Sequence, residues 1–470
     1  MSRAERIVIV GASLAGLHAA EALREGGFIG NLTLVGEEAH LPYDRPPLSK
    51  QVALGMVGPE CTTLPRRHAV NARWRLGTRA TGVDLAMQTV ALANGEHESF
   101  DRLLIATGTR ARPWGRPTEA ALHGVLTLRT LEDAASLRSA LQAHPERVVV
   151  IGGGFNGSEI ASACRSLDIP VTLIESNATP LAGALGCVVG RAAAVLQRAN
   201  GVDLRCGTRV ERLEGGADGH VRRVYLSGGD TPIETSLVVV ALGAMPNVEW
   251  LADSGLAAGP HGVACDASCR AFDRFGIATD DIYVAGDVAR FPHPLLDFEL
   301  VMLEHWGNAV AMADIAAHNM LHPGGMRRPH TAVPAFWSSQ FDVSIKSVGL
   351  PAIADEVMIV QGAVHRGEFV ALYGKQGRVV GAVAFDQGKW LPHYEATIAA
   401  RAAFPGPTGM DAPPDATPQP AEFPLRSARS MYTPTTIRGH SPTNQMTIVP
   451  LGSAQKHFAK TATSDEEYRQ

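Results

Sequence analysis

Two glycine clusters in this chain have the spacing that holds the phosphates of a dinucleotide. The fuller match is Gly152, Gly154 and Gly157, which follow the β-branched run 148–151 and precede a helical pattern beginning at Glu159. The first glycine of such a motif makes a tight turn, the second lets the backbone approach a pyrophosphate, and the third packs helix on strand. The pyrophosphate then lies at the positive end of the helix dipole. The sequence therefore predicts a dinucleotide site here.

The nucleotide expected at this site is NAD(H). Glu175 follows the apolar run 171–174, about twenty residues beyond the glycines, where an acid hydrogen-bonds the ribose hydroxyls. An arginine that could hold a 2′-phosphate does not follow closely. The pattern therefore favours NAD(H) over NADP(H).

The N-terminus carries a second copy of this pattern. Gly11 and Gly16 follow a short apolar run, and Ser13 stands in the place of the middle glycine. A helical pattern and the apolar run 32–35 come next, with Glu37 as the acid. Two dinucleotide sites in one chain imply two dinucleotides, and FAD with NAD(H) is the usual pairing.

Composition excludes several other classes of protein. A chain of 470 residues is expected to form several domains, because single cores stop growing at roughly 250–300 residues. The net charge of −5 argues against nucleic-acid binding, and no apolar run is long enough to suggest a membrane span. None of the six cysteines forms a C-x-x-C motif or lies in the first fifty residues, so a redox-active disulfide beside a flavin is not expected. These features fit a cytoplasmic protein.

The loop 40–50 adds cations beside the first nucleotide site. Its prolines fix an extended course, and Arg45 and Lys50 suit a flavin's diphosphate and ring edge. With the two glycine motifs, this loop resembles the ferredoxin/rubredoxin/putidaredoxin reductase family, which is built like glutathione reductase and is related to apoptosis-inducing factor. Further motifs of that family are matched at 104–108, 241–247, 282–288, 304–309 and 335–342.

The resemblance implies an α/β fold with two Rossmann-like domains of the glutathione-reductase type and a small C-terminal α/β interface domain. The expected limits are 1–112 and 245–325 for a discontinuous FAD-binding domain, 113–244 for the NAD-binding domain, and 326–402 for the interface domain. Strands are expected at 343–348, 357–361, 369–373 and 379–385, and helices at 304–319 and 394–403. The segment 403–470 is a proline-rich linker and extension, expected to be disordered or to strap a partner or second subunit.

The resemblance also implies the site residues. Catalytic roles are expected for Lys50, Glu159, Trp306 and Trp337, and no metal site is expected. Cofactor-binding roles are expected for Gly11, Ser13, Leu14, Ala15, Gly16, Glu37, Arg45, Lys50, Thr107, Gly108, Gly152, Gly154, Phe155, Asn156, Gly157, Glu159, Glu175, Gly243, Gly286, Asp287, Glu304, His305, Trp306 and Trp337. The carboxylate of Asp287 can accept hydrogen bonds from ribityl hydroxyls, although a helix N-cap is the alternative.

The implied reaction is the transfer of a hydride from NADH to flavin N5, followed by single-electron transfer to a ferredoxin-type iron–sulfur protein. That partner would serve a haem-thiolate monooxygenase or a Rieske oxygenase. Lys50 is expected to pair with Glu159 beside the flavin, the alternative being a surface ion pair of little energetic weight. Trp306 and Trp337 are expected to shape the exposed side of the flavin.

Three residues depart from the family pattern, namely Ser13, Asn156 and Met302. Met302 replaces a cation expected near the nicotinamide entrance, which leaves two alternative functions open. These are a stand-alone flavin oxidase or dehydrogenase acting on a small molecule, and a low-turnover flavoprotein scaffold. A monomer and a homodimer both fit. Candidate cations for docking an acidic ferredoxin are Arg66, Arg67, Arg73, Arg75, Arg79, Arg327 and Arg328.

Overall fold

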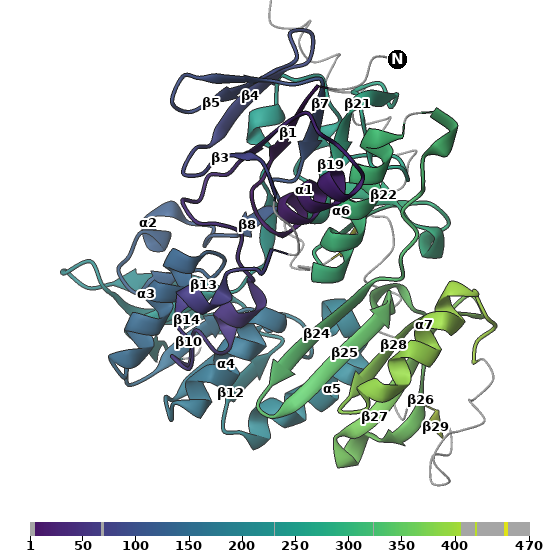
Figure 1. Ribbon diagram of the computed structural model, residues 1–470. Helices are drawn as coiled ribbons and strands as arrows, with labels where there is room; N and C mark the ends of the chain where they lie inside the picture. The colour runs from purple at the N-terminus through teal and green to yellow at the C-terminus, as the bar shows by residue number, and fades with distance from the viewer. Residues whose placement is uncertain are drawn as a thin grey trace, which may run out of the picture.

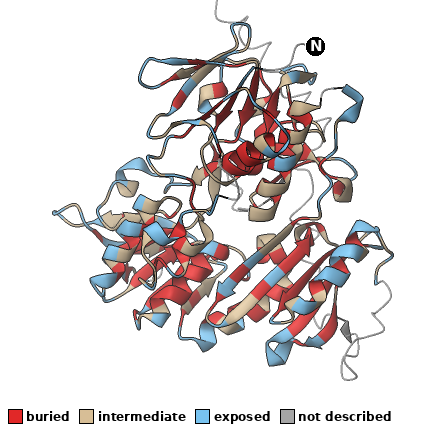
Figure 2. Ribbon diagram, viewed as in Figure 1, coloured by how far each residue is buried: buried red, intermediate tan, exposed pale blue. Residues whose placement is uncertain are grey.

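The computed structural model describes residues 5–66, 70–229, 231–322 and 324–405, together with the backbone of two short strands at 419–420 and 446–449. Figure 1 shows three units, each built on its own sheet. The upper unit contains the N-terminal residues and part of the green segment, and the blue and the green-yellow units lie below it. In Figure 2 the central strands of each sheet are buried, and the buried cluster of the upper unit continues to residues of the two lower units, such as Leu185 and Phe369.

The upper unit is a mainly parallel sheet with the order β20-β21-β7-β1-β2-β3. Its strands are β1 (Arg6–Val10), β2 (Asn31–Val35), β3 (Arg73–Arg75), β7 (Arg102–Ile105), β20 (Arg270–Phe272) and β21 (Ala278–Val284). Helices α1 (Leu14–Glu25) and α6 (Trp306–Leu321) pack against each other beside it. The four apolar residues of β1 are buried, as expected for a parallel strand covered on both faces.

The second unit is a wholly parallel sheet with the order β12-β11-β10-β16-β9. Its strands are β9 (Val125–Leu126), β10 (Val148–Ile151), β11 (Val171–Glu175), β12 (Asp203–Cys206) and β16 (Leu237–Val240). Its helices are α2 (Pro117–Ala120), α3 (Leu131–Gln142), α4 (Phe155–Ser166) and α5 (Ala182–Ala199). A capping box formed by Thr130 and Asp133 begins α3.

The two glycine motifs fold alike. Gly11 and Gly152 have φ angles of 120° and 109°, in the region that side chains disfavour, and each makes the turn after its strand. A Cβ on Gly16 would lie 2.0 Å from the Gly11 carbonyl oxygen, and a Cβ on Gly157 would lie 1.9 Å from that of Gly152. The third glycine therefore lets helix and strand approach closely in both units, as the spacing predicts.

The third unit is an antiparallel sheet with the order β24-β25-β28-β27-β26-β29. Its elements are β24 (Ala335–Gln340), β25 (Val343–Gly349), β26 (Glu356–Ala363), β27 (Glu368–Lys375), β28 (Arg378–Phe385), β29 (Gln419–Pro420) and helix α7 (Leu391–Ala399). The four strands expected here are confirmed, and β24 precedes them as a strand that the sequence analysis did not assign.

Shorter strands form three further small sheets. One sheet contains β4 (Ala80–Asp84), β5 (Thr89–Leu92) and β6 (His97–Ser99). A second contains β13 (Val210–Gly215), β14 (Val221–Leu226) and β15 (Ile233–Glu234). A third contains β18 (Ala258–Gly259), β19 (Gly262–Ala264), β22 (Ala289–Pro292), β23 (Leu300–Leu303) and β30 (Met446–Val449). Strands β8 (Thr109–Ala111) and β17 (Ala244–Pro246) pair where the chain leaves and re-enters the upper unit.

Two expected helices begin elsewhere than the sequence suggested. Helix α6 starts at Trp306, so Glu304 and His305 precede it, because β23 continues to Leu303. Helix α7 starts and ends earlier than expected, at 391–399. Apart from the backbone of β29 and β30, the extension beyond 405 lies outside the described residues, and the limits of the domains remain predictions. No helix in the described part of the chain is long and apolar enough to cross a membrane.

Substitution of the third glycine tests the packing in the second unit. Gly157→Ala places a methyl group against the Gly152 carbonyl, so we expect the free energy of unfolding to fall by about 2 kcal/mol. Gly115→Ala is the control, because nothing lies within 4 Å of the added Cβ. Urea unfolding of both variants measures the difference, and equal midpoints would contradict the packing argument.

Candidate functional site

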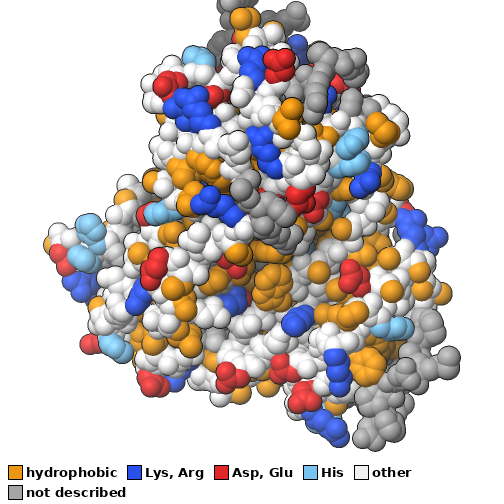
Figure 3. Space-filling view, in the orientation of Figure 1, with side chains coloured by type: hydrophobic (Ala, Val, Ile, Leu, Met, Phe, Trp, Pro, Cys, Tyr) orange, Lys and Arg blue, Asp and Glu red, His pale blue; other side chains and the backbone are white. Residues whose placement is uncertain are grey.

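A cavity of about 1120 Å³ lies where the three units meet. Figure 3 shows hydrophobic side chains gathered around this hollow, below the upper unit. Most of the residues expected at a site line the cavity, namely Gly11, Ser13, Leu14, Ala15, Glu37, Arg45, Lys50, Thr107, Gly108, Phe155, Asn156, Glu159, Gly286, Asp287, Glu304, His305, Trp306 and Trp337. The fold thus brings together residues that are as far apart in the sequence as Gly11 and Trp337.

Six expected residues do not line this cavity: Gly16, Gly152, Gly154, Gly157, Glu175 and Gly243. Gly16 and Gly157 act in helix packing, as described above. Glu175 is buried at the end of β11, where its carboxylate accepts hydrogen bonds from the Gly153 amide at 2.8 Å and the Asn177 amide at 2.6 Å. The acid therefore closes the turn of the second glycine motif.

The carboxylate of Glu159 in the cavity wall accepts three side-chain hydrogen bonds. Its Oε2 accepts from Ser49 Oγ at 2.5 Å and from Lys50 Nζ at 2.7 Å, and its Oε1 accepts from Ser338 Oγ at 2.6 Å. Only 4% of Glu159 is exposed, so the pair with Lys50 is not the surface ion pair considered as an alternative. Ser49 and Lys50 lie in the loop of the upper unit, Ser338 lies in the third unit, and Glu159 itself lies in α4 of the second unit.

The loop that carries Lys50 is fixed from several sides. The Arg45 guanidinium bonds Glu38 Oε1 at 2.6 Å and the Arg129 carbonyl at 2.6 Å. Lys50 Nζ also donates to the Pro46 carbonyl at 3.1 Å. These bonds hold the cations of the loop at the cavity and leave Arg45 charge-paired rather than free.

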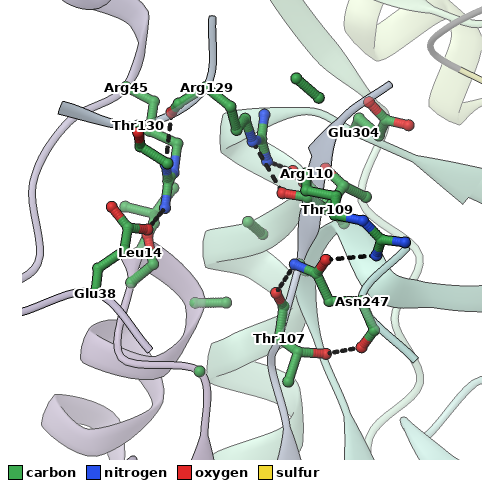
Figure 4. A pocket seen from close by; sticks show the side chains of 18 of the residues that line it. Leu14, Glu38, Arg45, Thr107, Thr109, Arg110, Arg129, Thr130, Asn247 and Glu304 are labelled. Atoms are coloured by element: carbon green, nitrogen blue, oxygen red, sulfur yellow. Dashed lines mark hydrogen bonds and ion pairs between the residues drawn. The ribbon is translucent and has the colours of Figure 1, made fainter. Parts of the chain in front are cut away.

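Arg129 and Asp287 form a second ion pair in the lining of the cavity. Arg129 Nη2 lies 2.7 Å from Asp287 Oδ2, and its Nε donates to the Thr109 carbonyl at 3.1 Å. Figure 4 shows Arg129 and Glu304 around the same part of the cavity. Desolvation and, to a lesser extent, the nearby Asp287 carboxylate raise the pKa of Glu304 to about 8, against the opposing effect of Arg129.

His305 stands immediately before α6 with a buried, unpartnered ring nitrogen. Its Nδ1 has no hydrogen-bond partner among the described residues, and burial lowers the pKa of this histidine to about 4. The ring lies against Phe336, with centroids 4.8 Å apart, and Phe336 in turn lies 4.9 Å from Phe155. A neutral imidazole and a helix N-terminus therefore meet at the cavity wall.

Trp306 and Trp337 lie edge to face, with ring centroids 6.3 Å apart. Trp306 Nε1 donates to Asp44 Oδ1 at 2.9 Å, which ties α6 to the loop 40–50. Trp337 is 44% exposed, so it is not a core tryptophan. The two rings form a partly open wall of the cavity.

The strands that leave and re-enter the upper unit are clamped by an asparagine that sequence reasoning did not select (Figure 4). Asn247 Nδ2 donates to the Thr107 carbonyl at 2.9 Å, and Thr107 Oγ1 donates to the Asn247 carbonyl at 2.8 Å. Arg110 Nη1 donates to Asn247 Oδ1 at 2.9 Å. Asn247 lies within a motif recognised in the sequence, and that position was the available signal.

Arg129, Ser49 and Ser338 were also missed as site residues. Ser49 and Ser338 lie in recognised motifs, next to Lys50 and Trp337, but serines are common in loops and strands. Arg129 has no local signal, because its partner Asp287 is 158 residues away in the sequence.

Met302 is buried, and three of the seven candidate docking cations are paired with acidic side chains. Met302 is 6% exposed in β23 and does not line the cavity, so its type does not alter the charge of the entrance. Arg73 and Arg75 pair with Glu98, and Arg327 pairs with Asp280. Arg79 is exposed and lines the cavity, and Arg67 lies outside the described residues.

Two family models match the chain over nearly all of its described length. The pyridine nucleotide-disulphide oxidoreductase model matches residues 5–313, and the reductase C-terminal model matches residues 335–415. The chain belongs to the ferredoxin reductases of the pyridine nucleotide-disulphide oxidoreductase family. The resemblance and the fold class expected from the sequence are confirmed.

Individual ferredoxin reductases match this chain over most of their own length. The chain is 35% identical over 421 residues to the anthranilate 1,2-dioxygenase system ferredoxin–NAD(+) reductase component of Burkholderia cepacia, covering 87% of this chain and 98% of that one. It is 33% identical to putidaredoxin reductase of Pseudomonas putida, over 83% and 92% of the two chains. The solved covalent putidaredoxin reductase–putidaredoxin complex matches with a TM-score of 0.79 and 31% identity, covering 91% of this chain and 98% of that chain.

The raised pKa of Glu304 predicts a specific pH dependence of stability. Its folded pKa, about 8, lies above the ordinary value of 4.5, so its contribution is fully present below pH 4.5 and is lost as the pH rises through 8. Glu304→Gln mimics the protonated group. We expect this variant to be more stable than the wild type at pH 9, by about 2 kcal/mol after screening by water in the open cavity, and equally stable at pH 4.

Urea unfolding midpoints of both proteins at pH 4 and pH 9 measure this difference. Asp253→Asn, at a surface carboxylate, serves as the control and is expected to show no such gap. A parallel pH dependence for wild type and Glu304→Gln would contradict the assignment.

Proposed function

We propose that the protein oxidises NADH and passes the electrons singly, through a bound FAD, to a ferredoxin-type iron–sulfur protein. The single observation that carries this proposal is the buried Lys50–Glu159 pair, which joins the two nucleotide-binding units at the wall of one cavity. Relatives named as reductase components of dioxygenase systems and as putidaredoxin reductase support the same reaction.

The residues of the upper unit fit FAD. Gly11 and Ser13 open α1 at the cavity, which is the arrangement that accepts a pyrophosphate, and Glu37 lines the cavity near the end of β2. The unpartnered Nδ1 of His305 and the N-terminus of α6 offer polar contacts to the flavin's pyrimidine edge. FAD accepts two electrons at once and releases them one at a time, which is the chemistry that a reaction between NADH and an iron–sulfur protein needs.

The second glycine motif fits NAD(H). Gly152 and Gly154 form the turn before α4, and the buried Glu175, bonded to the Gly153 and Asn177 amides, would hold this turn in place for the nucleotide. Phe155 and Asn156 extend from the start of α4 to the cavity, so the nicotinamide would enter between α4 and the upper unit. The remaining expected residues, Gly157, Gly243, Thr107, Gly108, Leu14, Ala15, Gly16 and Gly286, would shape the two nucleotide sites through the backbone.

Lys50 and Glu159 would act by position and charge. A cation held 2.7 Å from a buried carboxylate fixes both groups, and the ammonium stabilises negative charge that develops beside it. Asp287, bonded to Arg129 through Oδ2, would accept hydrogen bonds from ribityl hydroxyls at its other oxygen, and Arg45, while paired with Glu38, would lie beside the diphosphate. The partly exposed Trp337 and its neighbour Trp306 would border the route by which electrons leave.

The terminal acceptor is proposed as a haem-thiolate monooxygenase or a Rieske oxygenase served by the iron–sulfur partner. A cytoplasmic location is likewise a prediction. A stand-alone flavin oxidase is the second candidate, because the cavity is large enough to admit a small molecule beside a dinucleotide.

Anaerobic mixing with NADH tests the proposal. The yellow protein is expected to bleach and then to reduce a ferredoxin in stoichiometric steps. Lys50→Met should retain FAD and lower the limiting rate of bleaching at least about 100-fold, since one preorganised charge is worth roughly 10²–10³ in rate. Lys375→Met, on the third unit, is the control and should react like the wild type.

A flavin that stays oxidised with NADH would rule the proposal out. Bleaching by an organic substrate without nicotinamide, with rapid reoxidation by oxygen, would favour the oxidase instead.

A further inference from the structure

A chain of buried hydrogen bonds runs from α5 through the third unit to Glu159. Gln197 Nε2 of α5 donates to Gln340 Oε1 at 3.0 Å, and Gln340 Nε2 donates to Ser338 Oγ at 3.3 Å. Ser338 Oγ then donates to Glu159 Oε1 at 2.6 Å. Both glutamines and Ser338 are fully buried. Each member passes a donated hydrogen bond toward the carboxylate.

The direction of this chain has a physical consequence. Buried hydrogen bonds in series polarise one another, and a bond to a carboxylate is the strongest kind in such a series. The terminal torsion of a glutamate is otherwise broad, because it joins a tetrahedral carbon to a planar carboxylate. Ser338 holds one oxygen, so the other oxygen is directed at Lys50, 2.7 Å away.

We propose that Ser338 is a positioning residue for the reaction with NADH. Through Ser338, the third unit sets the orientation of Glu159 toward Lys50, so the reductive site is complete only when all three units are docked. This inference rests on the proposed function and deepens it, because it assigns the third unit a part in the reaction with NADH as well as in bordering the exit route.

The competing explanation is that these polar groups only join the third unit to α4. The same interface contains a hydrogen bond that separates the two explanations. The Phe341 amide donates to Ser162 Oγ at 2.6 Å, which joins the third unit to α4 without touching Glu159. Ser162→Ala therefore removes a comparable interface bond and leaves the chain to Glu159 intact.

The experiment compares Ser338→Ala, Ser338→Thr and Ser162→Ala in the full-length protein loaded with FAD. Anaerobic stopped-flow mixing with increasing NADH separates the limiting rate of flavin reduction from the dissociation constant of NADH. We expect Ser338→Ala to lower the limiting rate about tenfold, which corresponds to about 1.4 kcal/mol, with the dissociation constant within about twofold. Ser338→Thr keeps the hydroxyl and should recover most of the rate, and Ser162→Ala should react like the wild type.

A second readout does not depend on turnover. Limited acetylation followed by mass spectrometry reports how tightly Lys50 is held, and Ser338→Ala should be labelled at Lys50 several-fold faster than wild type or Ser162→Ala. If Ser338→Ala does not fold, Gln340→Leu, which removes the donor to Ser338, should slow reduction and speed labelling in the same sense.

Two results overturn the inference: a limiting rate in Ser338→Ala within twofold of the wild type, or the same slowing in Ser162→Ala. Failure of the proposed function is recognised separately, because wild-type flavin would then stay oxidised with NADH. In that case Lys50 labelling alone decides, and equal labelling of wild type and Ser338→Ala rejects the positioning role.

Discussion

The structure depends on one buried carboxylate that three units share. Glu159 lies in α4, and it accepts short hydrogen bonds from the loop that holds Lys50 and from β24, the first strand of the third unit. A buried carboxylate without such partners would cost several kcal/mol, so the position of each unit is constrained by the need to satisfy it. The same requirement places a cation, an acid and two aromatic walls around a single cavity.

The glycine motif is a second constraint, and it occurs in both the upper and the second unit. In both glycine motifs the third glycine lies against the carbonyl of the first, which fixes the start of a helix relative to its strand. The two helix N-termini are thereby aimed from separate sheets toward the region between them. The upper unit presents its motif directly to the cavity, whereas the second presents only the start of α4, with Phe155 and Asn156.

Much of this arrangement could be predicted because its determinants are local. Gly152, Gly154 and Gly157 lie within six residues, and the turn that they form follows from sterics at a positive φ. The Lys50–Glu159 pair followed only from resemblance, since its members are 109 residues apart. Ser338 lies 179 residues from Glu159, and Arg129 lies 158 from Asp287, so no periodicity or spacing could connect them.

The start of α6 shows a different limit of prediction from the sequence. Helical periodicity extends back to Glu304, but the chain there continues from the strand β23, and the helix begins only at Trp306. Pairing with β22 decided the boundary, and pairing partners are not visible in a local pattern. As a result, Glu304 and His305 are placed at the cavity wall rather than within a helix, where burial raises the pKa of Glu304 and lowers that of His305.

A crystal structure of the protein with FAD and NAD(+) tests the central claim most directly. The account predicts the isoalloxazine in the cavity beside Lys50 and His305, with the nicotinamide stacked on it at roughly 3–3.5 Å and Glu159 still bonded to Ser49, Lys50 and Ser338. A nicotinamide bound away from Glu159, or a Glu159 carboxylate turned out of the cavity in the complex, would contradict it.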